Sequence, residues 1–136
     1  MIVLIIVSIF ILLTVGGSVA LVVYGGSAPV YSISSTDRTF TIKSMYGKTL
    51  NLADIKSVDL KETLPGNLKR TNGYGGAGTV TKGYCSSDIG DVLVFVDSSI
   101  SQYIYLTTTT EIIIFNNHDI VQTKALYDEL VAAIAQ

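Results

Sequence analysis

The chain has 136 residues, of which 49% are hydrophobic and 15% are charged, and its formal net charge is −2. This composition is too apolar for a disordered protein, and the length is typical of one domain. The charges are unevenly placed, because every Asp, Glu, Lys and Arg residue lies at or after Asp37. An ordinary soluble domain does not begin with 36 residues that lack a charged side chain.

Residues 1–24 form one long apolar run, and a helix needs about 20 such residues to cross the hydrocarbon core of a membrane. The backbone there must be helical, because no water is available to its polar groups. We therefore predict a transmembrane helix over residues 1–24. The predicted span includes Ile2, Leu12 and Val22. Its polar interruptions, whose hydroxyls can bond to helix carbonyls, are Ser8, Thr14 and Ser18.

This segment has two other interpretations, a buried core element and a cleaved signal peptide. Core elements seldom run so long without a charge. A signal peptide needs a basic start, a shorter apolar stretch and a small-residue cleavage site. No Lys or Arg precedes the run, although residues 25–28, Gly-Gly-Ser-Ala, would serve as a cleavage site. We favour an uncleaved anchor, with residues 25–28 as a flexible linker.

Basic residues flank the predicted span only on its C-terminal side, where Arg38, Lys43 and Lys48 follow it. The positive-inside rule then places the body of the protein in the cytoplasm. The single Cys85 agrees, because it cannot form an intramolecular disulfide. We expect a single-pass protein of the cell membrane with a cytoplasmic C-terminal domain.

Small residues within the span offer a helix-packing face. Gly16 and Ala20 form a small-xxx-small pair with Gly17 beside them, and such pairs let two helices approach closely. The alternative is that glycine is simply common in membrane spans.

Residues 29–136 are predicted to be one mainly β domain, because the apolar period changes to two after the linker. We expect about seven or eight antiparallel strands. The candidate strands are 30–34, 39–43, 49–52, 55–61, 80–85, 92–97, 101–107 and 111–115. Residues 46–48 are a candidate hairpin turn, residues 63–78 a glycine-containing loop, and the quartet 112–115 a strand covered on both faces.

The chain ends in a predicted amphipathic helix over residues 123–135. Leu126, Leu130 and Ile134 recur at four-residue spacing and form one apolar face. Thr123 is the candidate N-cap. The helix would cover an open edge or end of the sheet.

The order of several strands followed by one helix resembles the bacterial pleckstrin-homology (PH-like) family. The local match consists of Glu62-Thr63-Leu64-Pro65, Arg70-Thr71-Asn72-Gly73-Tyr74-Gly75, Gly83-Tyr84 and Gly90. The resemblance covers residues 29–135. It implies two roughly orthogonal sheets forming a barrel capped by the helix, and it implies no catalytic residues. A membrane span beside the domain is common in that family.

The resemblance leaves the ligand open. Eukaryotic PH domains often bind phosphoinositides through basic residues of an early loop between strands. The comparable loop here, residues 45–48, holds one lysine, Lys48, so this sequence departs from that pattern.

Other motifs have ordinary structural interpretations. The loop residues Gly73, Tyr74 and Gly75 begin a G-x-G-x-x-G match that ends at Gly78, but no helix follows it, so we expect a connector. His118 is expected in an exposed turn and Cys85 as a buried thiol. Asp88 and Asp91 flank Gly90 in what we expect to be a solvated turn. No metal, cofactor or nucleic-acid partner and no enzymatic activity are expected.

The charge divides along the chain. Residues 37–82 hold eight basic and four acidic residues, whereas residues 83–136 hold one basic and seven acidic residues. The basic half could face anionic lipid or an acidic patch on a second copy. The candidate basic residues are Arg38, Lys43, Lys48, Lys69 and Arg70. The leading hypothesis is a membrane-anchored interaction or assembly module that associates with itself or with a membrane protein. The alternative is a module that binds anionic lipid head groups.

Overall fold

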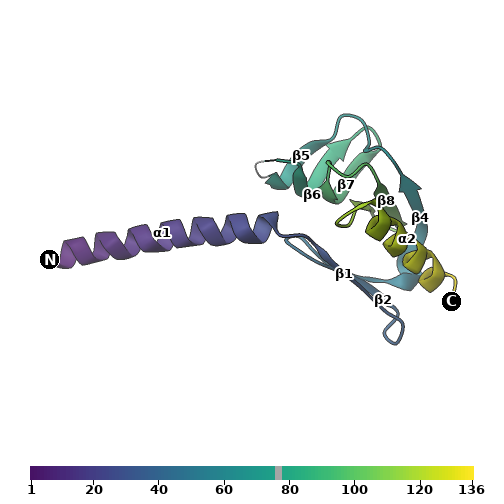
Figure 1. Cartoon of the computed structure of the whole chain (residues 1–136), viewed down its shortest axis with the longest axis horizontal. Coiled ribbons are helices and arrows are strands. Elements are labelled where there is room, and N and C mark those ends of the chain that lie inside the picture. The colour runs from purple at the N-terminus through teal and green to yellow at the C-terminus, as the bar shows by residue number, and fades with distance from the viewer. Residues whose placement is uncertain (76–77) are drawn as a thin grey trace.

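The computed structural model describes residues 1–75 and 78–136, except for the side chains of residues 20–22, 24 and 25. Its described elements are two α-helices, nine strands and one 3-10 turn (Figure 1). Their bounds are α1 (Ile2–Gly26), β1 (Val30–Ser34), β2 (Thr39–Lys43), β3 (Thr49–Asn51), η1 (Leu52–Asp54), β4 (Ile55–Lys61), β5 (Lys69–Gly75), β6 (Val80–Ser87), β7 (Gly90–Asp97), β8 (Tyr103–Thr108), β9 (Ile112–Phe115) and α2 (Ile120–Ile134). The prediction of a mainly β domain between an apolar helix and a C-terminal helix is confirmed.

Helix α1 projects away from the β domain along most of its length (Figure 1). The hydroxyls of its Ser and Thr residues donate hydrogen bonds to carbonyls of the preceding turn, as expected: Ser8 to Leu4 at 2.8 Å, Thr14 to Phe10 at 3.0 Å and Ser18 to Thr14 at 2.8 Å. The helix therefore presents no unsatisfied hydroxyl along its described apolar surface.

The strands form two sheets, and neither sheet is closed. The smaller has the order β1-β2-β3 and the larger the order β4-β8-β9-β7-β6-β5. The sequence predicts antiparallel pairing throughout, whereas β7 and β9 pair in parallel. The cause is topological, because β9 turns back from β8 and inserts between β8 and β7. This central position explains why Ile113, Ile114 and Phe115 are all fully buried, so the prediction of a strand covered on both faces is confirmed.

The smaller sheet crosses the larger one. The ring of Phe40 in β2 packs at a tilt against that of Phe115 in β9, with 5.5 Å between centroids, while Tyr46, just after β2, meets Tyr84 of β6 at 6.3 Å. Since β7 separates β9 from β6, the segment from Phe40 to Tyr46 runs across three strands of the larger sheet. The predicted turn at residues 46–48 is therefore also a contact between the sheets.

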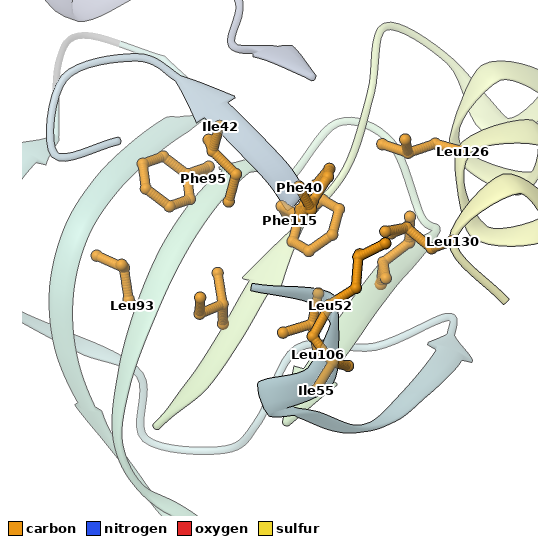
Figure 2. Packing of buried hydrophobic residues seen from close by; sticks show 12 residues of the cluster. Phe40, Ile42, Leu52, Ile55, Leu93, Phe95, Leu106, Phe115, Leu126 and Leu130 are labelled. Atoms are coloured by element: carbon orange, nitrogen blue, oxygen red, sulfur yellow. The ribbon is translucent and has the colours of Figure 1, made fainter. Parts of the chain in front are cut away.

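The main core lies between the two sheets and α2 (Figure 2). Phe40 and Ile42 point toward Phe95 and Phe115 of the larger sheet, and Leu126 and Leu130 of α2 close the side of this cluster. Burial of such side chains contributes about 1.5–3 kcal/mol each, and here it joins all three layers.

The opposite face of the larger sheet has its own cluster, which includes Val92, Val94 and Tyr105. The connection from β4 to β5 crosses this face, because those strands are the two edges of the sheet. Leu64 and Leu68 of the connection pack onto the cluster, and the hydroxyl of Tyr105 donates to the carbonyl of Thr63 at 2.7 Å. The predicted loop at residues 63–78 is therefore partly wrong, since β5 lies inside it.

Helix α2 packs against β4, β8 and η1. It begins earlier than predicted, because Asp119 rather than Thr123 is its N-cap and accepts a hydrogen bond from the backbone N–H of Gln122 at 2.7 Å. Thr123 is fully buried in the first turn, where its hydroxyl donates to the carbonyl of Asp119 at 2.7 Å. The expectation that this helix covers an edge of the sheet is confirmed at β4.

Candidate functional site

A cavity of about 150 Å³ lies where α1 joins the β domain. The end of α1 and the residues that follow it form one wall, and residues of β6, β7 and the segment after β9 form the other. Its polar lining residues are Ser27, Lys82, Asp97, Asn116, Asn117 and His118. The site is therefore assembled from four separate parts of the chain.

Lys82 of β6 is the unusual residue of this cavity, because its side chain is only 1% exposed. Its ammonium group donates a hydrogen bond to the backbone carbonyl of Ser27, the first residue after α1. The structure shows no ion pair between Lys82 and a carboxylate in the part of the chain that it describes. Burial lowers the pKa of Lys82 below its ordinary value, since desolvation disfavours the charged form.

Asp97, at the end of β7, carries the opposite charge in the same cavity. Its Oδ1 atom accepts hydrogen bonds from the hydroxyl of Thr79 at 2.5 Å and from the hydroxyl and backbone N–H of Ser99 at 2.6 and 2.9 Å. The bonds from the Ser99 and Thr79 side chains hold the pKa of Asp97 below its ordinary value. Asp97 therefore stays ionised at neutral pH.

Asn116 fixes the floor of the cavity and is only 3% exposed. Its Nδ2 donates to the carbonyls of Asp97 at 2.9 Å and Ile100 at 3.2 Å, and its Oδ1 accepts from the backbone N–H of Asp97 at 2.9 Å. Its own carbonyl accepts from the hydroxyl of Tyr31 at 2.8 Å. These bonds tie β1, β7 and β9 together beside the cavity.

The predicted membrane-span residues lie on α1, which is long and apolar enough to cross a membrane over Ile2–Val19. Ile2 is 74% exposed and Leu12 is 72% exposed, so the β domain does not cover them. The side chain of Val22 lies outside the described residues.

The helix-packing candidates Gly16 and Gly17 face open space, since a Cβ atom on either would meet nothing within 4 Å. The side chain of Ala20 lies outside the described residues. The small-residue face is therefore open at the two glycines, and a second helix could approach there.

The five candidate basic residues do not form one patch. Nη1 of Arg38 donates to the carbonyl of Ala133 at 3.0 Å, near the C-terminal end of α2. Lys48 forms an ion pair with Glu111 just before β9. The other three are exposed on two different sheets: Lys43 on β2, and Lys69 and Arg70 on β5.

The residues Gly73, Tyr74 and Gly75 lie in strand β5 rather than in a connector loop, which corrects that expectation. Gly73 pairs with Gly83 of β6, and the two strands pass so closely that a Cβ on Gly73 would lie 2.1 Å from the carbonyl oxygen of Lys82. These glycines are needed for close strand approach. Part of the G-x-G-x-x-G match, residues 76–77, lies outside the described residues.

The remaining motifs are placed as follows. His118 is exposed just before α2, as expected, and Cys85 is buried, as expected. Asp88 accepts a hydrogen bond from the side chain of Asn67 at 2.7 Å, and Asp91 is exposed. Within the described residues, no group of three or more His, Cys, Asp or Glu side chains is placed to hold a metal ion.

Lys82 is a residue of this cavity that was not predicted from the sequence. The signal was present, because alternation along β6 places Lys82 on the same face as Val80 and Tyr84. Its partner across the sheet is Phe95, a core residue. A lysine at an inward position of a strand is the pattern that marks it.

No family model, curated protein or solved structure matches the chain.

Proposed function

We propose that this chain is a single-pass membrane-anchored module whose β domain binds protein partners or further copies of itself. The observation that supports this most is the exposed apolar surface of α1, which the described part of the β domain leaves uncovered (Figure 1). At about 1.5 Å per residue, its 25 residues extend about 37 Å, enough for a hydrocarbon core of about 30 Å. Lipid would supply the cover that α1 lacks.

We propose further that the domain is PH-like. The crossing sheets and the C-terminal helix beside them support this architecture. The parallel pairing of β7 with β9 is a departure from the all-antiparallel pattern.

The proposed orientation places the β domain in the cytoplasm. Its support is the basic residues that follow α1 and the single free thiol, Cys85. Reporters fused in turn to each terminus of the full chain test this orientation. Reporter activity on the cytoplasmic side from the C-terminal fusion alone is the expected result, and activity from the opposite fusion contradicts it.

Strand β5 is the proposed contact surface. It is an edge of the larger sheet and pairs only with β6 among the described strands, so its outer backbone groups are open to strand addition. It carries Lys69 and Arg70, both exposed, whereas residues 83–136 have an excess of six acidic charges. A basic edge and an acidic half favour contact between copies.

The mass of the full-length protein in detergent, measured over a concentration series, tests this surface. We expect the mass to rise with concentration and the rise to disappear in a Lys69→Glu, Arg70→Glu variant. Lys43→Glu is the control, because Lys43 is exposed on the other sheet. A monomer at every concentration contradicts self-association. Capture of a partner from native membranes by the wild type, but not by the β5 variant, would then support a protein partner.

A further inference from the structure

The cavity at the end of α1 lies at the depth of lipid head groups, if α1 spans the bilayer as proposed above. The helix ends at Gly26, and the next three residues line the cavity. Because α1 is only about 7 Å longer than the hydrocarbon core, its end emerges within the head-group layer. A cavity of about 150 Å³ accepts a molecule of the size of benzene, so a phosphate group fits.

Lys82 supplies a cation for such a group, and its hydrogen-bond donors are only partly used. An ammonium group has three N–H donors, and the one acceptor that the described structure provides is the carbonyl of Ser27. A buried cation that lacks a counter-charge is costly. Phosphate oxygens in the cavity would supply both the missing acceptors and the negative charge.

The carboxylate of Asp97 narrows the class of phosphate-containing ligand that matches the charges of the cavity. Its Oδ1 takes all three hydrogen bonds described above, and Oδ2 accepts none from the described residues. The wall formed by β6 and β7 thus presents both an ammonium and a carboxylate, and these two groups do not pair with each other in the described structure. A ligand that carries a phosphate and an amine matches both charges.

We propose that the cavity binds the head group of an aminophospholipid, with its phosphate at Lys82 and its primary amine at Asp97. The contact of Lys82 with Ser27 also has a purely structural explanation, because a cation at the C-terminal end of a helix is favourable. Capping requires no ligand, so a lipid measurement separates the two explanations.

The test uses the full-length protein in nanodiscs that contain phosphatidylethanolamine, phosphatidylglycerol and phosphatidylcholine in equal parts. Native mass spectrometry then identifies the lipids that leave the disc with the protein. We expect phosphatidylethanolamine to be enriched over phosphatidylcholine by about ten-fold, the ratio that one charge-assisted hydrogen bond supplies. Lys82→Met should reduce the retention of all three lipids, because each carries a phosphate, while Lys43→Met, the same change at an exposed lysine, should preserve retention.

Asp97→Asn is the second variant, and it keeps the proposal testable if Lys82→Met fails to fold. It should retain lipid but lose the preference for phosphatidylethanolamine over phosphatidylglycerol. Equal lipid retention by the wild type and both variants would overturn the proposal. Failure of the wild type to enter nanodiscs would instead overturn the membrane anchor itself.

A second arm adds inorganic phosphate to the detergent-solubilised protein and follows the NMR resonances of Lys82. Unchanged resonances support the lipid head group as the source of the phosphate. A saturable shift without any retained lipid would assign the cavity to free phosphate and overturn the lipid proposal.

Discussion

The side chain of Lys82 in β6 donates a hydrogen bond to the backbone carbonyl of Ser27, so a buried residue of the domain contacts the end of the apolar helix. These residues are 55 positions apart. The contact connects α1 to the larger sheet beyond the covalent linker. The predicted flexible linker at residues 25–28 is therefore partly wrong, because α1 continues to Gly26 and the residue after it is held by Lys82.

The buried lysine should make stability depend on pH. Burial lowers its pKa below the ordinary value of 10.5, so the unfolded chain binds more protons than the folded chain between these two pKa values. The buried ammonium destabilises the fold by its full amount at pH values below the pKa that Lys82 has in the folded state. This destabilisation disappears as the pH rises to 10.5. We expect the wild type to gain stability relative to Lys82→Met across this window, measured by urea unfolding in detergent at a series of pH values.

The comparison with Lys82→Met also removes the contribution of other groups that titrate there. Burial raises the pKa of Cys85 and of Tyr103, which makes stability fall as pH rises above their ordinary values of 9.0 and 10.0. Both proteins share these groups. A difference between the two proteins that does not change with pH would show that Lys82 has no lowered pKa.

Two glycines with positive φ should respond differently to alanine. Gly83 has φ of 115° and a Cβ there would lie 2.5 Å from the carbonyl oxygen of Asn72, whereas Gly90 has φ of 103° and open space. Gly90→Ala should cost about 1–2 kcal/mol for backbone conformation alone. Gly83→Ala should cost about 1–3 kcal/mol more, because β5 and β6 must separate. Equal free energies of unfolding for the two variants would contradict the close approach of these strands.

Asn116→Ala should destabilise the cavity floor. It removes three side-chain hydrogen bonds at a buried position and leaves the backbone N–H of Asp97 without its partner. We expect a loss of about 3 kcal/mol in the free energy of unfolding. Asn51→Ala is the control, because the exposed Asn51 makes one capping bond, to Ala53 at 3.1 Å, and should cost about 1 kcal/mol. Similar losses in the two variants would argue against the Asn116 network.

We expect Arg38 to stabilise the folded domain rather than to contact a lipid surface. Arg38→Gln removes a cation and a hydrogen bond from the last turns of α2, which should cost about 1 kcal/mol. Lys69→Gln should be neutral, since Lys69 is exposed on β5. Chemical denaturation in detergent measures both. A neutral Arg38→Gln would mean that its contact with Ala133 contributes nothing.

The features that follow from local pattern could be predicted. The apolar run identified α1, and alternation identified eight of the nine described strands, because each signal depends on residues close in sequence. Strand β5 was missed because its side chains are largely exposed and its glycines are typical of a loop.

Long-range features could not be read from one sequence. The insertion of β9 between β8 and β7 depends on pairing between distant strands, which no local period records. The candidate site also depends on contacts between distant segments, because its residues come from four parts of the chain: Ser27, Lys82, Asp97 and Asn116. Alternation along β6 gives the face of the strand on which Lys82 lies, but only the fold brings it to the end of α1.

Extraction of cell membranes with alkaline carbonate, followed by intact-mass measurement of the full chain, tests the central claim most directly. We predict that the uncleaved 136-residue protein stays in the membrane pellet. A Leu12→Arg, Val15→Arg variant should leave it, because each arginine costs about 2.5–3.5 kcal/mol at the centre of a span. Recovery of the wild type in the soluble fraction, or of a shorter chain that begins after residue 24, would contradict a membrane anchor.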